Sequence, residues 1–324
     1  MRHLLFALTL TLGCAPPTDA VAEQSPLEVR QALATTRTLS PERCLRAASL
    51  RLRELPPSAQ DLADLSAKRR TFSELVDGYL QGPEFAAVAL RWYRSEFSSS
   101  QKPIAGVDAD EPARIAQHVV VNHRDYRELL TATYTVDATG NRVALGPEAA
   151  GVLTTPQYLT ARVGILRRRW AANVIRQFLG IRLVAVNLPP DTNPDVSRKA
   201  VAANPACAGC HVNKFYGIDR VSAAADCFPP ELEGQRQQGC VETPSEVVGK
   251  PTNGLPSLGR AIADSHEFLA TTTNFFYAKL YGRPLSPNEK EFYRAVATRF
   301  SAEQQYDAVA LIRTLVNRKE FCER

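Results

Sequence analysis

Two cysteines and a histidine with a fixed spacing are the residues of this sequence best suited to chemistry. Cys207, Cys210 and His211 form a C-x-x-C-H sequence, which is typical of covalent c-type haem attachment. Thiols three residues apart lie about one helical turn apart, so each can add to one haem vinyl group. The next residue is then carried beneath the iron, where its imidazole is the proximal ligand. The sequence therefore predicts one covalent haem c.

Two other chemistries use the same residue types. Zinc takes four nitrogen or sulfur ligands in a tetrahedron, and Cys227 and Cys240 are the cysteines that would complete such a set. These two do not form a second C-x-x-C, however. A thioredoxin-like thiol pair expects a βαβ context, which this sequence does not suggest. The spacing favours haem over both alternatives.

The ligand on the other face of the iron decides what a haem protein does. Met1 is the only methionine, and signal-peptide removal would take it away, so methionine ligation is not expected. His266 and His123 are the candidate distal ligands, with His118 weaker. The alternative interpretation of His266 is a core histidine on the apolar face of a helix. The alternative interpretation of His123 is a surface or capping role.

Three function classes follow from these choices. A six-coordinate iron with a distal histidine predicts electron transfer, which is the favoured interpretation. An open or displaceable distal position predicts a peroxidase-like enzyme. A haem that chiefly organises the fold predicts a binding module. Motifs of serine hydrolases, zinc proteases and P-loop nucleotide binders are absent from the sequence, so whether the chain is an enzyme is left open.

The first residues predict export. Arg2 and His3 precede an apolar run, 4–12, that is too short to span a bilayer. The run ends in Thr-Leu-Gly-Cys14, which resembles a bacterial lipobox. Residues 1–13 are therefore predicted to be a lipoprotein signal peptide, with Cys14 as the lipid attachment site. An ordinary cleaved signal is the alternative. The expected location is the bacterial cell envelope, as an outer-membrane lipoprotein facing the periplasm or the surface.

Export permits disulfides, and four further cysteines are present. They allow three connectivities. Proximity favours a Cys227–Cys240 disulfide, which leaves Cys44 for Cys322. The net charge of +5 is too small to indicate nucleic-acid binding. The basic triplets at 68–70 and 167–169 are expected on solvated helix faces. The expected partners are a redox protein at the envelope and the membrane that holds the lipid anchor.

Apolar periodicity and capping residues predict a mainly α, multi-helix globular protein with a haem segment and at most a short β-hairpin. The expected regions are a lipid anchor and tether (14–39), an N-terminal helical region (40–187), the haem-attachment segment (188–257) and a C-terminal helical region (258–324).

Local signals place the individual elements. Helices are expected to begin at Ser40, at Ser58, at Gly82-Pro83 and at the capping boxes 71–74 and 286–289. Further helices are expected over 112–121, 125–130, 166–178 and 309–316. A longer helix is expected to place Ile262, His266, Leu269, Thr273, Phe276 and Leu280 on one face. A hairpin is expected around 137–141, and 219–257 is expected to be loop-like after the proline-rich stretch 188–194.

With these segments in place, the chain resembles the planctomycete-type cytochrome proteins, secreted haem-motif proteins of adjoining domains. The segments that carry the resemblance are 51–60, 123–134, 204–211 and 258–283. The family usually follows the histidine with Asp-Pro and then glycine, whereas Val-Asn-Lys-Phe-Tyr-Gly217 follows here. The resemblance implies a haem protein, and it implies little about chemistry because the family has no settled activity.

Overall fold

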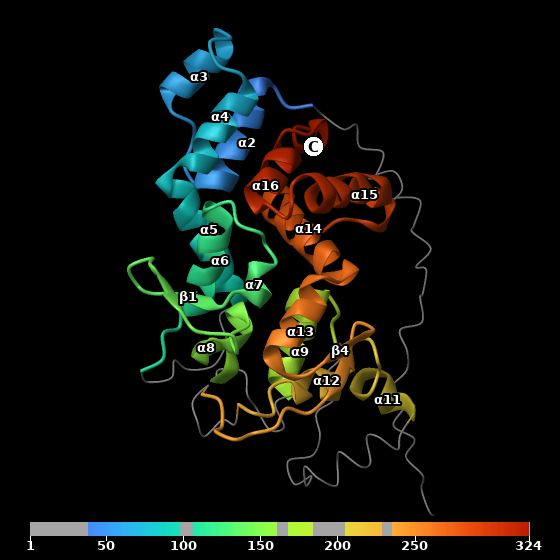
Figure 1. Ribbon diagram of the computed structural model, residues 1–324. Helices are drawn as coiled ribbons and strands as arrows, with labels where there is room; N and C mark the ends of the chain where they lie inside the picture. Colours follow the sequence, from blue (N-terminus) through green and yellow to red (C-terminus); the bar gives the residue numbers. More distant parts are fainter. Residues whose placement is uncertain (1–37, 98–105, 161–167, 184–204, 229–234, 324) are drawn as a thin grey trace, which may run out of the picture.

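Helices make up most of the part of the chain that the structure describes, as the periodicity predicts (Figure 1). The computed structural model describes residues 38–97, 106–160, 168–183, 205–228 and 235–323. The predicted signal peptide, Cys14, most of the tether and the proline-rich stretch 188–194 lie outside these residues. Across the described residues, no helix is both long and apolar enough to cross a membrane.

The N-terminal helices begin where their capping residues predict. The Ser40 hydroxyl accepts from the Arg43 amide, and Ser58 and Thr71 each form a complete capping box. The predicted apolar stripe from Phe85 to Trp92 is buried. These elements are α2 (Pro41–Arg53), α3 (Ala59–Ser66), α4 (Phe72–Gln81), α5 (Pro83–Phe97) and α6 (Glu111–Val121).

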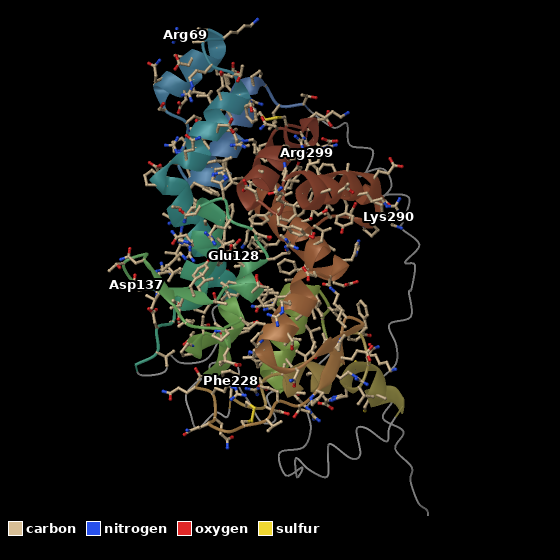
Figure 2. The ribbon with its side chains drawn as sticks, in the orientation of Figure 1. Arg69, Glu128, Asp137, Phe228, Lys290 and Arg299 are labelled. Atoms are coloured by element: carbon tan, nitrogen blue, oxygen red, sulfur yellow. A yellow bond between two sulfur atoms is a disulfide. The ribbon has the colours of Figure 1, made fainter. Side chains whose placement is uncertain are left out.

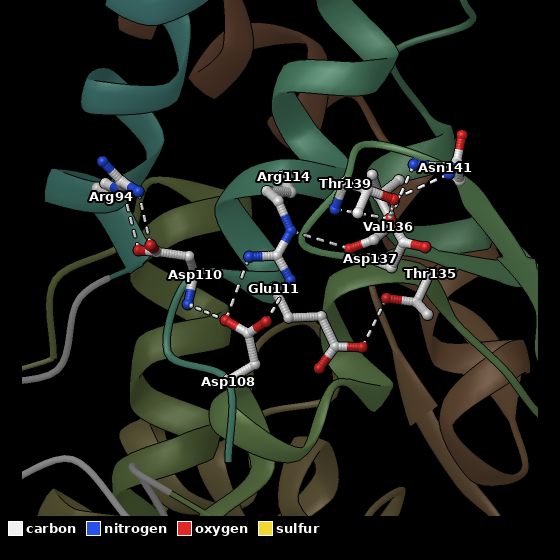
Figure 3. A network of polar contacts seen from close by, with 10 residues as sticks. All are labelled: Arg94, Asp108, Asp110, Glu111, Arg114, Thr135, Val136, Asp137, Thr139 and Asn141. Carbon is white, nitrogen blue, oxygen red and sulfur yellow. Dashed lines mark hydrogen bonds and ion pairs between the residues drawn. The ribbon is translucent and has the colours of Figure 1, made fainter. Parts of the chain in front are cut away.

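The first hairpin forms as predicted, from β1 (Tyr134–Val136) and β2 (Arg142–Ala144). A polar network ties it to α6 (Figure 3). The Arg114 guanidinium donates to the Val136 carbonyl at 3.0 Å and pairs with Asp108. Thr135 donates to Glu111 at 2.5 Å. The loop before α6 and the hairpin after it are thereby held against one helix.

The prediction of a helix over 125–130 is wrong about where the helix begins and ends. Only α7 (Glu128–Thr131) is helical. Asp125 instead forms an antiparallel bridge with Asp307, and the Tyr126 amide donates to the Tyr306 carbonyl at 3.0 Å. The Asp125 and Tyr126 carbonyls still accept turn hydrogen bonds from the Glu128 and Leu129 amides. The pairing of this stretch with a distant segment therefore accompanies a turn, and the α-helix begins only at Glu128.

The prediction of at most one hairpin, with a loop over 219–257, is also wrong. β3 (Ser245–Val247) and β4 (Lys250–Thr252) form a second two-stranded sheet. Val248 and Gly249 between them both have positive φ, as a two-residue hairpin turn with matching twist requires. The strands have three residues each, and Pro251 weakens the strand pattern. The other elements of this part are η1 (Gly151–Thr154), α8 (Pro156–Thr160), α9 (Arg168–Leu179), α11 (Pro205–His211) and α12 (Ile218–Ala223).

The C-terminal part contains a helix break that moves His266 off the expected apolar face. α13 (Gly254–Ala263) ends before Ser265, whose hydroxyl caps α14 (His266–Tyr281) by accepting from the Phe268 amide at 3.1 Å. Ile262 and His266 are therefore on different helices, and His266 is exposed. The remaining elements are η4 (Pro287–Glu289), α15 (Lys290–Thr298), the π-helical turn η5 (Arg299–Glu303), α16 (Ala308–Val316) and η6 (Lys319–Phe321).

One hydrophobic core joins the regions expected at 40–187, 188–257 and 258–324. Its buried residues run from Cys44 to Phe321, with Trp170 and Tyr93 among the largest. Helices α9 and α12 pack together, as do α9 and α14, so the segment containing α11 adjoins the core through α12 (Figure 1). Both predicted disulfides are present, Cys44–Cys322 and Cys227–Cys240 (Figure 2).

The two disulfides differ greatly in the length of chain that they close. Cys44 and Cys322 are 278 residues apart, whereas Cys227 and Cys240 are 13 apart. In the chain-entropy account the longer loop contributes about 6 kcal/mol and the shorter about 3 kcal/mol. We therefore expect the Cys44→Ser/Cys322→Ser variant to lose more free energy of unfolding in urea than Cys227→Ser/Cys240→Ser does. An equal or smaller loss for the long loop would contradict this account.

Candidate haem-attachment site

The three residues of the C-x-x-C-H sequence lie on one short helix. α11 (Pro205–His211) carries Cys207, Cys210 and His211, and it lies at one end of the molecule (Figure 1). Cys207 is half-buried, Cys210 is exposed, and neither belongs to a disulfide. The two thiols thus lie about one helical turn apart on the same helix, as two bonds to one porphyrin require.

The His211 imidazole is fixed by a carboxylate. Its Nδ1 lies 3.1 Å from Asp219 Oδ2, and Arg168 Nε donates to Asp219 Oδ1 at 3.0 Å. Partial burial by itself would raise the pKa of Asp219. The hydrogen bond from His211 and the charge of Arg168 outweigh that effect, so the pKa of Asp219 lies below its usual value. Asp219 is therefore an anion that accepts from both neighbours.

This contact selects which ring nitrogen is left for a metal. A carboxylate accepts the Nδ1–H hydrogen, which leaves the Nε2 lone pair available. Histidines that bind metals generally donate their other N–H to a carboxylate or carbonyl in this way. The residues present therefore fit a haem group, with Cys207 and Cys210 for the covalent bonds and His211 Nε2 for the iron.

A tight turn brings Asp219 back to His211. Gly217 lies between α11 and α12 (Ile218–Ala223), and its amide donates to the Asn213 carbonyl at 2.8 Å. A Cβ at Gly217 would lie 2.5 Å from that oxygen and 2.8 Å from the His211 carbonyl oxygen. Arg220 Nε also donates to the Val212 carbonyl at 2.8 Å. Backbone and side-chain hydrogen bonds thus hold residues 212–217 in a loop that requires glycine at Gly217.

Apolar side chains lie beside the motif. Val212 and Phe215 are two of the few large hydrophobic residues with more than a third of their surface exposed. The second hairpin supports this segment, because the Val248 amide donates to the Phe215 carbonyl at 2.8 Å. An apolar macrocycle attached to Cys210 would find exposed apolar surface within the same segment.

The alternatives to haem lose support. Zinc ligation by four residues would need Cys227 and Cys240 as thiolates, but they are joined in a disulfide. Within the described ranges, no cluster of three or more His, Cys, Asp or Glu residues is arranged for a metal ion. The described strands form only two-stranded antiparallel sheets, so the described part contains no βαβ unit for a thioredoxin-like pair.

The candidate distal ligands have contacts of their own. His123 Nδ1 lies 2.9 Å from Asp307 Oδ2, and the His266 ring packs edge-on against Tyr293. His118 Nδ1 lies 3.2 Å from Asn122 Nδ2. In the part of the chain that the structure describes, no hydrogen bond, ion pair or ring contact joins any of them to His211.

The sequence pattern did not identify Asp219 or Arg168. Neither belongs to a recognisable motif, and the triplet 167–169 was expected to be solvated. That expectation is wrong for Arg168, whose side chain is 15% exposed and whose Nη2 is buried without an acceptor among the described residues. The capping glycine before Ile218 was the one available signal for a turn that returns the chain to His211.

Comparisons with protein-family models, with curated proteins and with solved structures found no match.

Two glycines near the motif give a matched test of this geometry. We expect Gly217→Ala to separate Asp219 from His211, because the added Cβ would meet two backbone oxygens. The expected cost is about 2–3 kcal/mol, with a changed ¹⁵N shift of the His211 ring. Gly209→Ala is the control, since a Cβ at Gly209 meets nothing within 4 Å. Equal effects of the two changes would contradict the proposed role of Gly217.

Proposed function

We propose that this chain is an exported monohaem c-type protein that transfers electrons at the bacterial cell envelope. Cys207 and Cys210 would hold the haem, and His211 would bind its iron through Nε2. The observation that carries the proposal is the Asp219 carboxylate at 3.1 Å from His211 Nδ1, because it orients the imidazole of a C-x-x-C-H sequence as an iron ligand.

Electron transfer is supported by the placement of the motif. A bound haem supplies reversible one-electron chemistry at its iron. α11 lies at an end of the molecule, and Cys210 is exposed, so the attached group would be accessible to a redox partner (Figure 1). The partner is proposed to be another redox protein of the envelope. No proton-transfer group is needed for this activity.

A haem enzyme with an open or displaceable distal position is the second candidate. An anionic hydrogen-bond acceptor makes the proximal imidazole more basic, and a more electron-rich iron favours reaction with peroxide. The same contact also favours a low-potential electron carrier. What occupies the distal position therefore separates the two candidates.

The cell envelope is supported by the cysteines. Two disulfides favour an oxidising compartment. The lipobox-like sequence ending at Cys14 supports a lipid anchor that would hold the protein at a membrane. The similarity to planctomycete-type cytochrome proteins agrees with an exported haem protein.

Haem attachment is tested by mass spectrometry of protein exported together with the haem-maturation machinery. We expect the mass of one haem, lost in Cys207→Ser/Cys210→Ser but kept in Cys227→Ser/Cys240→Ser. Low-spin iron that does not bind carbon monoxide would support electron transfer, whereas high-spin iron that binds it readily would support the enzyme. Export with both motif thiols unmodified would contradict the proposal.

The role of Asp219 is tested by the midpoint potential of the haem-loaded protein. A nearby anion stabilises the more positively charged ferric state, so Asp219→Asn is expected to raise the potential. A rise of about 60 mV corresponds to about a tenfold change in the one-electron equilibrium. Asp226→Asn is the control, because this carboxylate accepts from Thr243 instead of His211. Equal shifts in both variants would mean that the contact with His211 has no specific effect.

A further inference from the structure

A cavity of about 450 Å³ lies away from the haem-attachment segment, between residues of α5, α9 and α14. None of its lining residues belongs to 205–228. The volume is within the range of small-molecule sites. The proposed function does not use this cavity, so its chemistry needs a separate account.

Aromatic rings make one wall of the cavity. The Tyr93 ring stacks on Phe97 with centroids 5.8 Å apart and on Phe275 with centroids 5.5 Å apart. Phe97 also packs against Phe178 from α9 at 6.2 Å. Rings that contact one another on several sides have few alternative rotamers, so this wall is a preformed apolar surface.

The charges of the residues that line the cavity do not sum to zero, because positive side chains outnumber negative ones. Arg176 and Glu96 pair at 3.5 Å and neutralise one another. Lys279 and Arg182 line the same cavity, and neither makes an ion pair among the described residues. Arg182 is exposed, whereas Lys279 is partly buried with its ammonium 5.2 Å from the Phe275 ring centroid. Burial lowers the pKa of Lys279, and the carboxylate of Glu96 opposes that shift.

Two buried hydroxyl groups add a hydrogen-bond donor. The Tyr93 and Tyr126 hydroxyls are 3.1 Å apart, and both residues line the cavity. Two hydroxyls carry two hydrogens, but the contact between them uses only one. The other has no acceptor among the residues that the structure describes. Burial raises the pKa of both hydroxyls, so both remain protonated. A buried donor without an acceptor is costly unless a ligand or water satisfies it.

We propose that this cavity binds a small monocarboxylate with an aromatic or short alkyl body. The carboxylate would accept from Lys279 and from the free hydrogen of the Tyr93–Tyr126 pair, and the apolar body would contact Phe97 and Phe275. A single negative charge matches Lys279, the partly buried cation of this cavity, which makes no ion pair within the described residues. A phosphate would favour the planar fork of arginine, but Arg176 is already paired and Arg182 is exposed.

Isothermal titration of the full-length, folded protein tests the proposal with two probes of nearly equal shape, 4-phenylbutyrate and 4-phenylbutanamide. The acid is expected to bind about tenfold more tightly than the amide, which lacks the charge. In Lys279→Gln this preference is expected to disappear while amide binding persists. Lys290→Gln, which removes an exposed lysine of α15, is the control and is expected to keep the preference (Figure 2).

A second variant separates ligand binding from folding. Tyr93→Phe/Tyr126→Phe removes both hydroxyls and with them the free hydrogen, and it is expected to weaken binding of the acid about threefold to tenfold with little change in the melting temperature. The proposal is overturned if the acid and the amide bind equally to the unmodified protein, if neither binds, or if Lys279→Gln keeps the full preference for the acid.

Discussion

The contact from Arg168 through Asp219 to His211 joins the segment that contains the C-x-x-C-H sequence to the helical core. Arg168 begins α9, whose buried face contains Trp170 and Val174. Asp219 lies in the first turn of α12, and His211 ends α11. Three helices are thus connected by two charge-assisted hydrogen bonds, which are stronger than bonds between neutral groups. The position of the imidazole depends on how α9 packs in the core.

This dependence explains why the tight turn at Gly217 matters. α11 and α12 are short helices of seven and six residues, and helices of that length are not stable in isolation. Their arrangement therefore comes from tertiary contacts, including the burial of Ile218 and Val221 and the support of the β3–β4 hairpin at Phe215. A C-x-x-C-H sequence can attach haem in many contexts, but here the surrounding fold also fixes the tautomer of its histidine.

The two proposed sites are supported by the same hydrophobic core and disulfides. The aromatic cavity lies among α5, α9 and α14, and α9 also supplies Arg168 to the haem-attachment segment. The Cys44–Cys322 disulfide joins α2 to the C-terminal turn, so residues near Cys322 are held against α2. A small molecule bound in the cavity and a haem bound at α11 would both contact or adjoin α9.

Short-range signals determined much of this protein from the sequence alone. Capping residues such as Ser40 and Thr71 predicted helix starts because their hydrogen bonds reach only three residues along the chain. The stripe of Trp170, Val174 and Phe178 predicted α9 because burial follows the helical repeat. The spacing of Cys207, Cys210 and His211 likewise predicts haem attachment without reference to the fold.

Tertiary structure decided what depends on distant partners. Arg168 and Asp219 are 51 residues apart, and nothing local to either one specifies the other. The apolar pattern of the sequence continues across Ser265, so periodicity predicts that His266 lies on the same helix face as Ile262. One helix ends at Ala263, however, and Ser265 caps the next, so the two residues lie on different helices. Asp125 and Tyr126 pair with Asp307 and Tyr306, and the α-helix begins only at Glu128. Such contacts depend on packing between elements, which local propensity and periodicity do not encode.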